Sequence, residues 1–391
     1  MIKIILFTMN YEPSIGGAAV LLADIARYFS EKAKVTVIAP KVEGYANYDS
    51  KQPYKTIRFN LSKRISSLSP LIKIIGAIFK DKPDIILLGH TMASQGVGVI
   101  LASKIFKVPY IIYSHGNDLH FNISKGLITS KIDRLFRNSI LNNASQIYAN
   151  STYTRDLLLS IGQNPDKIKV INPCIDTELF NPDVEIEDVV CAHKLQGKKV
   201  ILTVSRLSTG KNIINVLKAL PDVIREVPNL KYLIVGQGPR EHILKQLTRE
   251  LKLEDHVNFI GGVYRKALPP YYCAADVFIM PSVYLKESKR NETFGIVFGE
   301  AGACAKPVIA GNIGGIGDIV VHEETGLTVN GENIDEIRAA LVKLLVNDAY
   351  AKKLGQNGMK MIREKFSPEK VFSRFMPDIN KCLNRCGNTG L

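Results

Sequence analysis

Residues 2–7 read Ile2-Lys3-Ile4-Ile5-Leu6-Phe7, a short apolar run of the kind that forms a buried β-strand. The turn Pro13-Ser14-Ile15-Gly16-Gly17 follows it. After this turn, apolar residues recur at the spacing of one helix face, at Leu22, Ile25, Ala26 and Phe29. A strand followed by a helix is the first half of a βαβ unit, so the start of the chain predicts a parallel sheet.

The same alternation continues through the first half of the chain. Apolar runs predict further strands at residues 35–39, 84–88, 109–113, 146–149 and 168–171. Helix-patterned stretches lie between them, including residues 70–79, where Ser69 is the expected N-cap and Pro70 the first helical residue. Strands that alternate with helices in this way predict a doubly wound α/β domain.

A break then separates this half from a second run of the same pattern. Pro173, Pro182 and an acidic stretch at residues 183–188 precede the next strong strand. The predicted strands of the second run are residues 200–205, 232–235, 257–260, 276–280 and 307–310. Its predicted helices are residues 241–251, 295–303, 333–346 and 348–365. We therefore expect two Rossmann-like domains, residues 1–172 and 199–367, joined by a linker at 173–198.

Composition narrows the classes of protein. The chain has 391 residues, of which 46% are hydrophobic and 23% charged, as in globular proteins with substantial cores. No stretch approaches the length of a membrane span, and the N-terminal apolar run is too short for a signal peptide. The six cysteines form no Cys-x-x-Cys and no Cys/His cluster, which indicates thiols in a reducing cytoplasm. We expect a cytoplasmic protein.

The positive charge is unevenly distributed. The chain carries a formal net charge of +14. Residues 1–172 hold 22 Lys and Arg against 11 Asp and Glu, a net +11, which leaves +3 for the rest. An excess of this kind favours an anionic partner, and it belongs to the N-terminal half.

Residues that suit an anionic ligand follow several of the predicted strands. Gly16-Gly17 begins a helix, where free N–H groups attract phosphate, and His115-Gly116 follows the strand at 109–113. Arg206 and Lys211 follow the strand at 200–205, and two cations on one loop suit a diphosphate. Each fragment is also compatible with an ordinary turn or with solvated charges.

The most specific segment is Glu292-Thr293-Phe294-Gly295-Ile296-Val297-Phe298-Gly299-Glu300. Two glutamates with seven residues between them would stand on either side of a helix that begins near Gly295. The N–H groups of the first turn would point toward a ligand, with carboxylates nearby for sugar hydroxyls. An amphipathic helix with ordinary glutamates is the structural alternative.

Together these motifs resemble the retaining, GT-B-fold nucleotide-sugar glycosyltransferases marked by Glu-x7-Glu, glycosyltransferase family 4, group 1. The resemblance covers nearly the whole chain. The motifs that carry it are Pro13–Gly17, His115-Gly116, Val204–Leu207, Lys211, Val235–Pro239, Pro281-Ser282, Phe294–Glu300, Gly302–Pro307, Gly314-Gly315 and Thr325–Leu327. It implies two Rossmann-like domains that face a central cleft, with a final helix in residues 368–391 that packs back on the N-terminal domain.

The resemblance also implies roles for these residues. Glu300 would hold the ribose of the donor nucleotide, Glu292 the hydroxyls of its sugar, and His115 the sugar near the reacting centre. Arg206 and Lys211 would neutralise the diphosphate. The phosphates and the sugar would also accept hydrogen bonds from main-chain N–H groups at Gly16, Gly17, Phe294, Gly295, Ile296 and Val297.

Negative charge must grow on the departing diphosphate and be stabilised there. A metal ion would need acidic ligands, and the chain contains no Asp-x-Asp. We therefore expect no metal site and no cofactor. The expected reaction moves a hexose, with mannose favoured, from a GDP- or UDP-linked donor to a hydroxyl of a lipid-linked or glycan acceptor. Glycolipid or cell-surface polysaccharide synthesis is the expected setting.

Two other functions are compatible with parts of the sequence. A two-domain NAD-dependent oxidoreductase would share the fold, but Gly-x-Gly-x-x-Gly is missing and no acid ends the second strand at Ala39-Pro40. A nucleic-acid-binding protein would explain the charge, but no binding motif supports it, so we expect no nucleic-acid partner. The sequence predicts no oligomeric state.

The region from Arg58 to Lys82 raises the question of the acceptor. It contains Arg58, Lys63, Arg64, Lys73, Lys80 and Lys82 against one acid, Asp81. Its helix carries Leu71, Ile72, Ile74, Ile75, Ile78 and Phe79. Either the apolar residues pack on the sheet and the lysines are solvated, or this surface docks on anionic lipid at the cytosolic face of a membrane.

Overall fold

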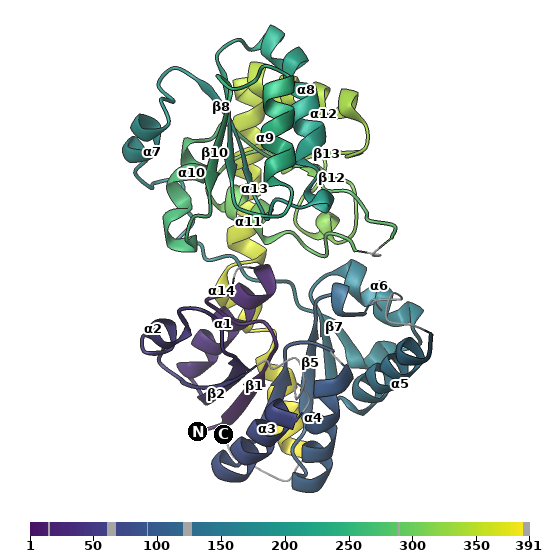
Figure 1. Ribbon diagram of the computed structural model, residues 1–391. Helices are drawn as coiled ribbons and strands as arrows, with labels where there is room; N and C mark the ends of the chain where they lie inside the picture. Colours follow the sequence, from purple (N-terminus) through teal and green to yellow (C-terminus); the bar gives the residue numbers. More distant parts are fainter. Residues whose placement is uncertain (15, 61–67, 92, 120–126, 288–289, 386–391) are drawn as a thin grey trace. The chain divides into compact units, whose positions relative to one another are not determined.

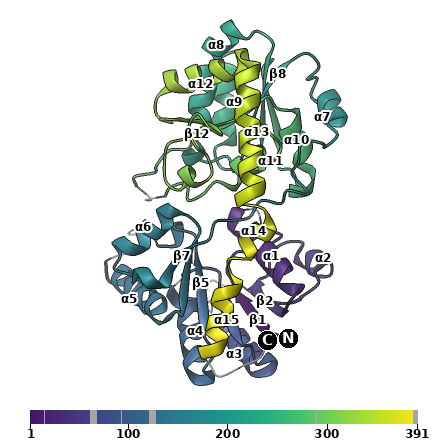
Figure 2. The same ribbon diagram turned by 180° about the vertical axis from the view of Figure 1, so that it is seen from behind.

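The computed structural model describes residues 1–14, 16–60, 68–91, 93–119, 127–287 and 290–385, without the side chains of 68–71, 93–97, 127–132 and 382–385. The chain separates into two compact units. Unit 1 contains Met1–Cys174 and the chain from Glu369 onward, and unit 2 contains Ile175–Pro368. Figures 1 and 2 show each unit as a sheet with helices on both faces.

Unit 1 is built on seven parallel strands in the order β3-β2-β1-β4-β5-β6-β7. The apolar runs form the central strands because both of their faces are covered, as in other parallel sheets. Ile4 of β1, for example, pairs with Val35 of β2 and with Ile85 of β4. The strands are β1 Lys3–Phe7, β2 Lys34–Pro40, β3 Lys55–Phe59, β4 Ile85–Leu88, β5 Tyr110–Ser114, β6 Gln146–Ala149 and β7 Ile168–Val170.

Helices from both ends of the chain cover this sheet. One hydrophobic core joins it to α1, α14 and α15, and a second core joins its other face to α3, α4 and α5. The helices are α1 Gly17–Ser30, α2 Tyr45–Asp49, α3 Leu68–Asp81, α4 Ala93–Phe106, α5 Leu127–Asn143, α6 Thr152–Ser160, α14 Pro368–Phe372 and α15 Met376–Arg385. Single 3-10 turns lie at Asn117–Leu119 and Pro165–Lys167.

Unit 2 repeats the plan with six parallel strands in the order β10-β9-β8-β11-β12-β13. The strands are β8 Lys199–Val204, β9 Leu230–Val235, β10 Val257–Gly261, β11 Val277–Met280, β12 Val308–Gly311 and β13 Gly326–Val329. The helices are α7 Glu187–Ala192, α8 Ile213–Glu226, α9 Glu241–Glu250, α10 Pro269–Ala274, α11 Ile296–Ala303, α12 Ile334–Val346 and α13 Asp348–Lys365. Its 3-10 turns lie at Thr209–Lys211, Arg265–Ala267 and Ile316–Asp318.

The predicted α/β architecture of two doubly wound sheets is confirmed. Two strands were not predicted, β3 and β13, and each lies at the edge of its sheet. The single helix expected after residue 367 is two helices, α14 and α15. No described helix combines the length and apolarity needed to cross a bilayer.

The segment predicted as a linker packs largely as part of unit 2. Ile175 and Phe180 are fully buried in its core, and Val189 of α7 lies in the same cluster. Apolar residues spaced among the acidic ones account for the difference, because the core covers them while the carboxylates stay at the surface.

Candidate active site

Strands β8 and β11 lie side by side in the sheet of unit 2. The chain after β8 continues to β9 on one side, and the chain after β11 continues to β12 on the other, so the strand order reverses between them. In doubly wound sheets, ligands bind at the carboxyl ends of the strands at this switch point. The loop after β8 carries Arg206 and Lys211, and the connection after β11 carries Glu292 and leads into α11. Arg206, Lys211 and Glu292 therefore lie in the connections at this end of the sheet.

Lys211 and Glu292 form an ion pair there, in which the Lys211 ammonium donates a hydrogen bond to Glu292 Oε2. Both side chains are partly buried, with 26% and 15% of their surface exposed. Arg206 is exposed, and its guanidinium forms no ion pair with another described residue. The two cations thus stand on one loop, one held by a carboxylate and one open to solvent.

Two glycines allow the close backbone approaches that hold these loops. Gly236 has φ of 133°, and a Cβ there would lie 1.9 Å from the Ser205 carbonyl oxygen beside Arg206. Gly314 has φ of 57°, and its Cβ would lie 2.0 Å from the carbonyl oxygen of Glu292. That carbonyl accepts a 2.9 Å hydrogen bond from the N–H of Gly315. The Gly314-Gly315 loop therefore fixes the backbone of Glu292.

Helix α11 begins beside Glu292. Gly295 is its N-cap residue, with φ of 85°, and Phe294 is buried against Phe366 with ring centroids 5.8 Å apart. Ile296 and Val297 are the first two helical residues and are half-buried. The N–H groups of a first turn have no partner within the helix, so this end suits an anion.

Glu300 lies in the second turn of α11, and only 4% of the residue is exposed. The Tyr272 hydroxyl donates a 2.8 Å hydrogen bond to Glu300 Oε2, and Arg265 Nε lies 3.5 Å from Oε1. Burial, reinforced by the Glu300 carboxylate, raises the pKa of Tyr272 well above its usual value, so the phenol remains a proton donor. Glu300 is thus a fixed, buried carboxylate.

In unit 1 the predicted site residue His115 follows β5. Its Nε2 lies 3.1 Å from the Gly89 carbonyl oxygen, which can only accept, so Nε2 carries the proton and Nδ1 is an acceptor. Burial lowers the pKa of His115, so the ring is neutral at pH 7. The His90 ring lies 5.0 Å from it, centroid to centroid, and His90 Nδ1 is 3.1 Å from Thr8 Oγ1.

Asp118 ties together the loops that hold His115. Its Oδ1 accepts hydrogen bonds from the His115 N–H at 3.0 Å and from the Ser114 hydroxyl at 3.1 Å. Its Oδ2 accepts from the N–H of Thr91 at 3.0 Å and from the Thr91 hydroxyl at 2.9 Å. The loops after β4 and β5 are therefore cross-linked by one carboxylate.

The other predicted residues of unit 1 lie at the start of α1. Gly16 is its N-cap residue, with φ of 152°, and Gly17 is its first residue; both are exposed. Gly16, Gly17 and His115 belong to unit 1, and the other predicted site residues belong to unit 2. The structure brings together Lys211 with Glu292, and it holds Glu300 separately with Tyr272 and Arg265.

Several residues of these networks were not predicted: Thr8, His90, Thr91, Asp118, Arg265 and Tyr272. The sequence held a signal for four of these six. Thr8 directly follows the β1 segment, His90 and Thr91 follow the β4 segment closely, and Asp118 stands three residues after His115. A polar side chain shortly after a predicted strand is the signal that these four share. Arg265 and Tyr272 carry no such signal.

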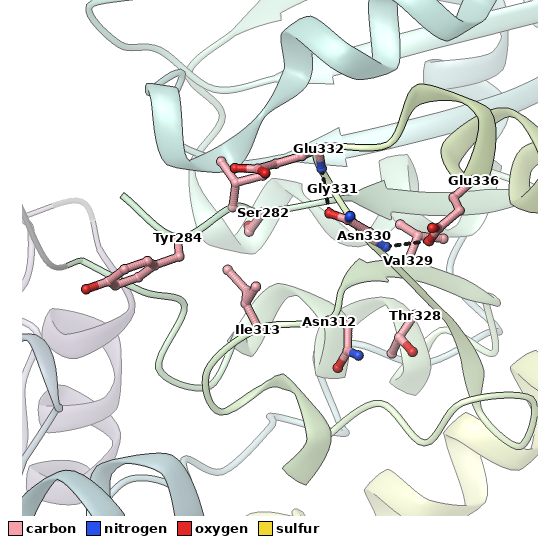
Figure 3. Close-up of a pocket in the computed structure, with 11 residues that line it drawn as sticks. Ser282, Tyr284, Asn312, Ile313, Thr328, Val329, Asn330, Gly331, Glu332 and Glu336 are labelled. Carbon is pink, nitrogen blue, oxygen red and sulfur yellow. Dashed lines mark hydrogen bonds between the residues drawn. The ribbon is translucent and has the colours of Figure 1, made fainter. Parts of the chain in front are cut away.

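A pocket of about 450 Å³ opens at the carboxyl ends of β11, β12 and β13 (Figure 3). Its polar lining includes Asn312, Thr328, Asn330 and Glu336, and none of the predicted site residues. Asn212 Nδ2 donates a 2.6 Å hydrogen bond to the carbonyl of Gly331, another lining residue. The pocket therefore lies next to the loop that carries Lys211.

Within the part of the chain that the structure describes, no group of three or more His, Cys, Asp or Glu side chains is placed to hold a metal ion. Of the cysteines described there, Cys174, Cys273 and Cys304 are buried free thiols, and Cys191 is exposed.

Each of the two units matches a known protein family. Residues 15–179 match the family described as Glycosyltransferase Family 4, and residues 190–361 match Glycosyl transferases group 1. A GDP-mannose-dependent phosphatidylinositol monomannoside mannosyltransferase of Mycobacterium tuberculosis is 28% identical over 377 residues, 93% of this chain and 94% of that protein. An alpha-monoglucosyldiacylglycerol synthase of Streptococcus pneumoniae is 27% identical, over 88% of this chain and 78% of that protein.

Solved structures match the whole fold. Anabaena HepE in complex with UDP aligns with a TM-score of 0.81 at 21% identity, covering 97% of this chain and 100% of the other. The sucrose-phosphate synthase of Thermosynechococcus elongatus aligns with a TM-score of 0.81 at 20% identity, over 98% and 100% of the two chains. The fold is therefore the GT-B fold of two Rossmann-like domains.

Proposed function

This chain belongs to the group 1, family 4 glycosyltransferases, and we propose that it moves a hexose, with mannose favoured, from a nucleotide diphosphate to an acceptor hydroxyl with retention of configuration. Because the chain belongs to this family, neither alternative function, that of an NAD-dependent oxidoreductase or of a nucleic-acid-binding protein, is supported. Glycolipid or cell-surface polysaccharide synthesis is the proposed setting, because two relatives are named for lipid acceptors.

The observation that carries the proposal is the arrangement around α11. Glu300 is a buried carboxylate on the helix, suited to a pair of ribose hydroxyls, and Glu292 stands just before the helix, suited to sugar hydroxyls. Between them in the chain lies a helix N-terminus whose N–H groups favour phosphate oxygens. Lys211 is already at this end through its ion pair with Glu292.

The reaction breaks the bond between the anomeric carbon and the diphosphate and forms one to the acceptor oxygen. Negative charge grows on the departing diphosphate, and Arg206, Lys211 and the first-turn N–H groups of α11 stabilise it. The departing phosphate takes the acceptor's proton on the same face of the sugar, so the configuration is retained. Neutral His115 offers Nδ1 as an acceptor to a sugar hydroxyl.

A donor screen tests this proposal. The purified chain is incubated with GDP-mannose, UDP-glucose, UDP-galactose and UDP-N-acetylglucosamine, and release of free nucleotide is followed. We expect turnover of one donor above the others, with GDP-mannose first, and an α-linked product by NMR from the α-linked donor. Absence of release from every donor, with and without a lipid extract, would overturn the assignment; a β-linked product would overturn retention.

A further inference from the structure

Exposed hydrophobic side chains gather on three neighbouring helices of unit 1. Twelve large hydrophobic residues are exposed in the described part of the chain. Six of them lie on α3, α4 and α5, namely Ile72, Phe79, Leu101, Ile105, Leu135 and Phe136, and we call these six the α3–α5 patch. Single exposed hydrophobics are ordinary, but a gathering of this kind marks an interaction surface.

Helix α3 is apolar on two opposite sides. Ile74, Ala77 and Ile78 face the sheet and are buried in the core that α3 shares with α4 and α5. Ile72 and Phe79 are seven residues apart, about two turns, on the outward side, with 65% and 73% of their surface exposed. The sequence left open whether this helix packs on the sheet or docks on lipid. The buried side packs on the sheet, and only the outward side is available for docking.

Helix α4 continues the same surface. Leu101 and Ile105 are one turn apart and 50% and 63% exposed, whereas Val99 and Ala102 are buried. Helix α4 packs against α3 on one side and against α5 on the other, and all three cover the same face of the sheet (Figures 1 and 2). The outward residues of the three helices thus form one face of unit 1.

Exposed cations lie on or directly after the three helices of this patch, with few acids to oppose them. The exposed ones are Lys73, Lys80, Lys82, Lys104, Lys107 and Arg134. The acids in the described parts of α3, α4 and α5 are Asp81, which forms a 3.0 Å ion pair with Lys55, and Asp133. Arg58, expected from the sequence to belong to this surface, is buried in a 2.7 Å ion pair with Asp49. Lys63 and Arg64 lie outside the described residues.

We propose that the α3–α5 patch docks unit 1 on an anionic lipid bilayer. The apolar side chains would enter the boundary between headgroups and acyl chains, and the exposed cations would meet lipid phosphates. A second copy of the chain fits less well, because its own cations would face these. The inference rests on the proposed function in one respect, because a bilayer would supply a lipid-linked acceptor. Docking itself needs no nucleotide-sugar donor.

Vesicle flotation at low and high salt tests the proposal. The full chain is mixed with phosphatidylcholine vesicles, with or without phosphatidylglycerol. We expect flotation only with phosphatidylglycerol, and its loss at high salt because exposed charges are then screened. The Phe79→Ser, Ile105→Ser pair and the Lys73→Glu, Lys80→Glu, Lys104→Glu triple should each lower the bound fraction about fivefold or more.

Matched controls lie in unit 2. Val346 on α12 is 61% exposed, and Lys352 and Lys353 on α13 are exposed. Val346→Ser and the Lys352→Glu, Lys353→Glu pair should bind vesicles as the wild type does. Thermal protection by GDP or UDP in every variant reports an intact donor site, so lost docking is distinguished from lost function.

Two results would overturn the proposal. One is a wild-type chain that does not float with anionic vesicles, or patch variants that float as well as it does. The other is a vesicle-free dimer, detected by light scattering, that the Phe79→Ser, Ile105→Ser pair dissolves. The second result would assign the patch to self-association.

Discussion

At the scale of single residues, the ion pair of Lys211 and Glu292 connects the loops after β8 and β11. Lys211→Ala removes a fixed cation from the place where charge develops, so the rate of transfer should fall about 100-fold or more. Lys218→Ala, an exposed lysine on α8, is the matched control and should leave the rate unchanged. Nucleotide release at saturating donor measures both, and a Lys211→Ala rate within a few-fold of wild type would refute the role.

A second residue-scale prediction concerns His90, which is buried beside His115. Burial, with the nearby His115 ring, lowers the pKa of His90 to about 3, whereas the unfolded chain has the ordinary value of 6.5. The unfolded state therefore binds the proton first as the pH falls below 6.5, and the free energy of unfolding decreases. At pH 5 this loss is about 2 kcal/mol relative to pH 7.

The measurement compares urea unfolding of the wild type and of His90→Asn at pH 7 and pH 5. The asparagine amide can still donate to Thr8 but takes up no proton in this range. The variant should lose about 2 kcal/mol less stability between the two pH values. An equal loss in both proteins would show that the His90 proton is not responsible.

The sequence indicated charged residues after the strands of unit 2, but not the partners that hold them. Glu300 is identified by its motif, yet Tyr272 and Arg265 reach it from α10 and from the turn before α10, 28 and 35 residues earlier. Such contacts depend on how helices pack over the sheet, which local patterns do not specify. Asp118 is the exception, because it lies in the same loop as His115.

At the scale of elements, α14 and α15 bring the C-terminal part of the chain back to unit 1. Phe375, between them, packs against Phe29 of α1, Tyr113 of β5 and Tyr148 of β6, with ring centroids 4.8 to 6.2 Å apart. Phe375→Ala should therefore cost about 3–5 kcal/mol of unfolding free energy. Val346→Ala, at an exposed position on α12, is the control, and a loss under 1 kcal/mol for Phe375→Ala would contradict this packing.

Most elements were predictable, and the two missed strands share a physical reason. Central strands are buried on both faces and appear as continuous apolar runs, such as Ile85–Leu88. Strand β3 reads Lys-Thr-Ile-Arg-Phe and β13 reads Gly-Leu-Thr-Val, and both are edge strands with mixed polarity. Edge strands need fewer apolar residues, so their patterns do not stand out from loops.

At the scale of the whole molecule, we propose two functions for the positive charge behind the net +14. In unit 2, Arg206 and Lys211 are proposed to bind the diphosphate, and in unit 1 exposed cations lie on or directly after the helices of the α3–α5 patch. The sequence located the excess of positive charge, but only packing shows which lysines are exposed and that Arg58 is not.

Charge neutralisation by fixed cations predicts that transfer needs no divalent ion. Nucleotide release should be unchanged by EDTA and by added Mg²⁺ or Mn²⁺, because Arg206, Lys211 and the α11 N-terminus supply the compensating charge. The assay runs at saturating donor with metal-free buffers. Activity that disappears in EDTA and returns with Mn²⁺ would contradict this account.

The central claim is that Glu300, held by Tyr272 and Arg265, anchors a donor nucleotide whose sugar this chain transfers. The most direct measurement is nucleotide release from the preferred donor by wild type and by Glu300→Gln, with thermal unfolding of both as a check on folding. The account predicts steady release by the wild type and a fall of about 100-fold or more in kcat/KM for Glu300→Gln, with an unchanged fold. Equal kcat/KM for the two proteins would contradict it.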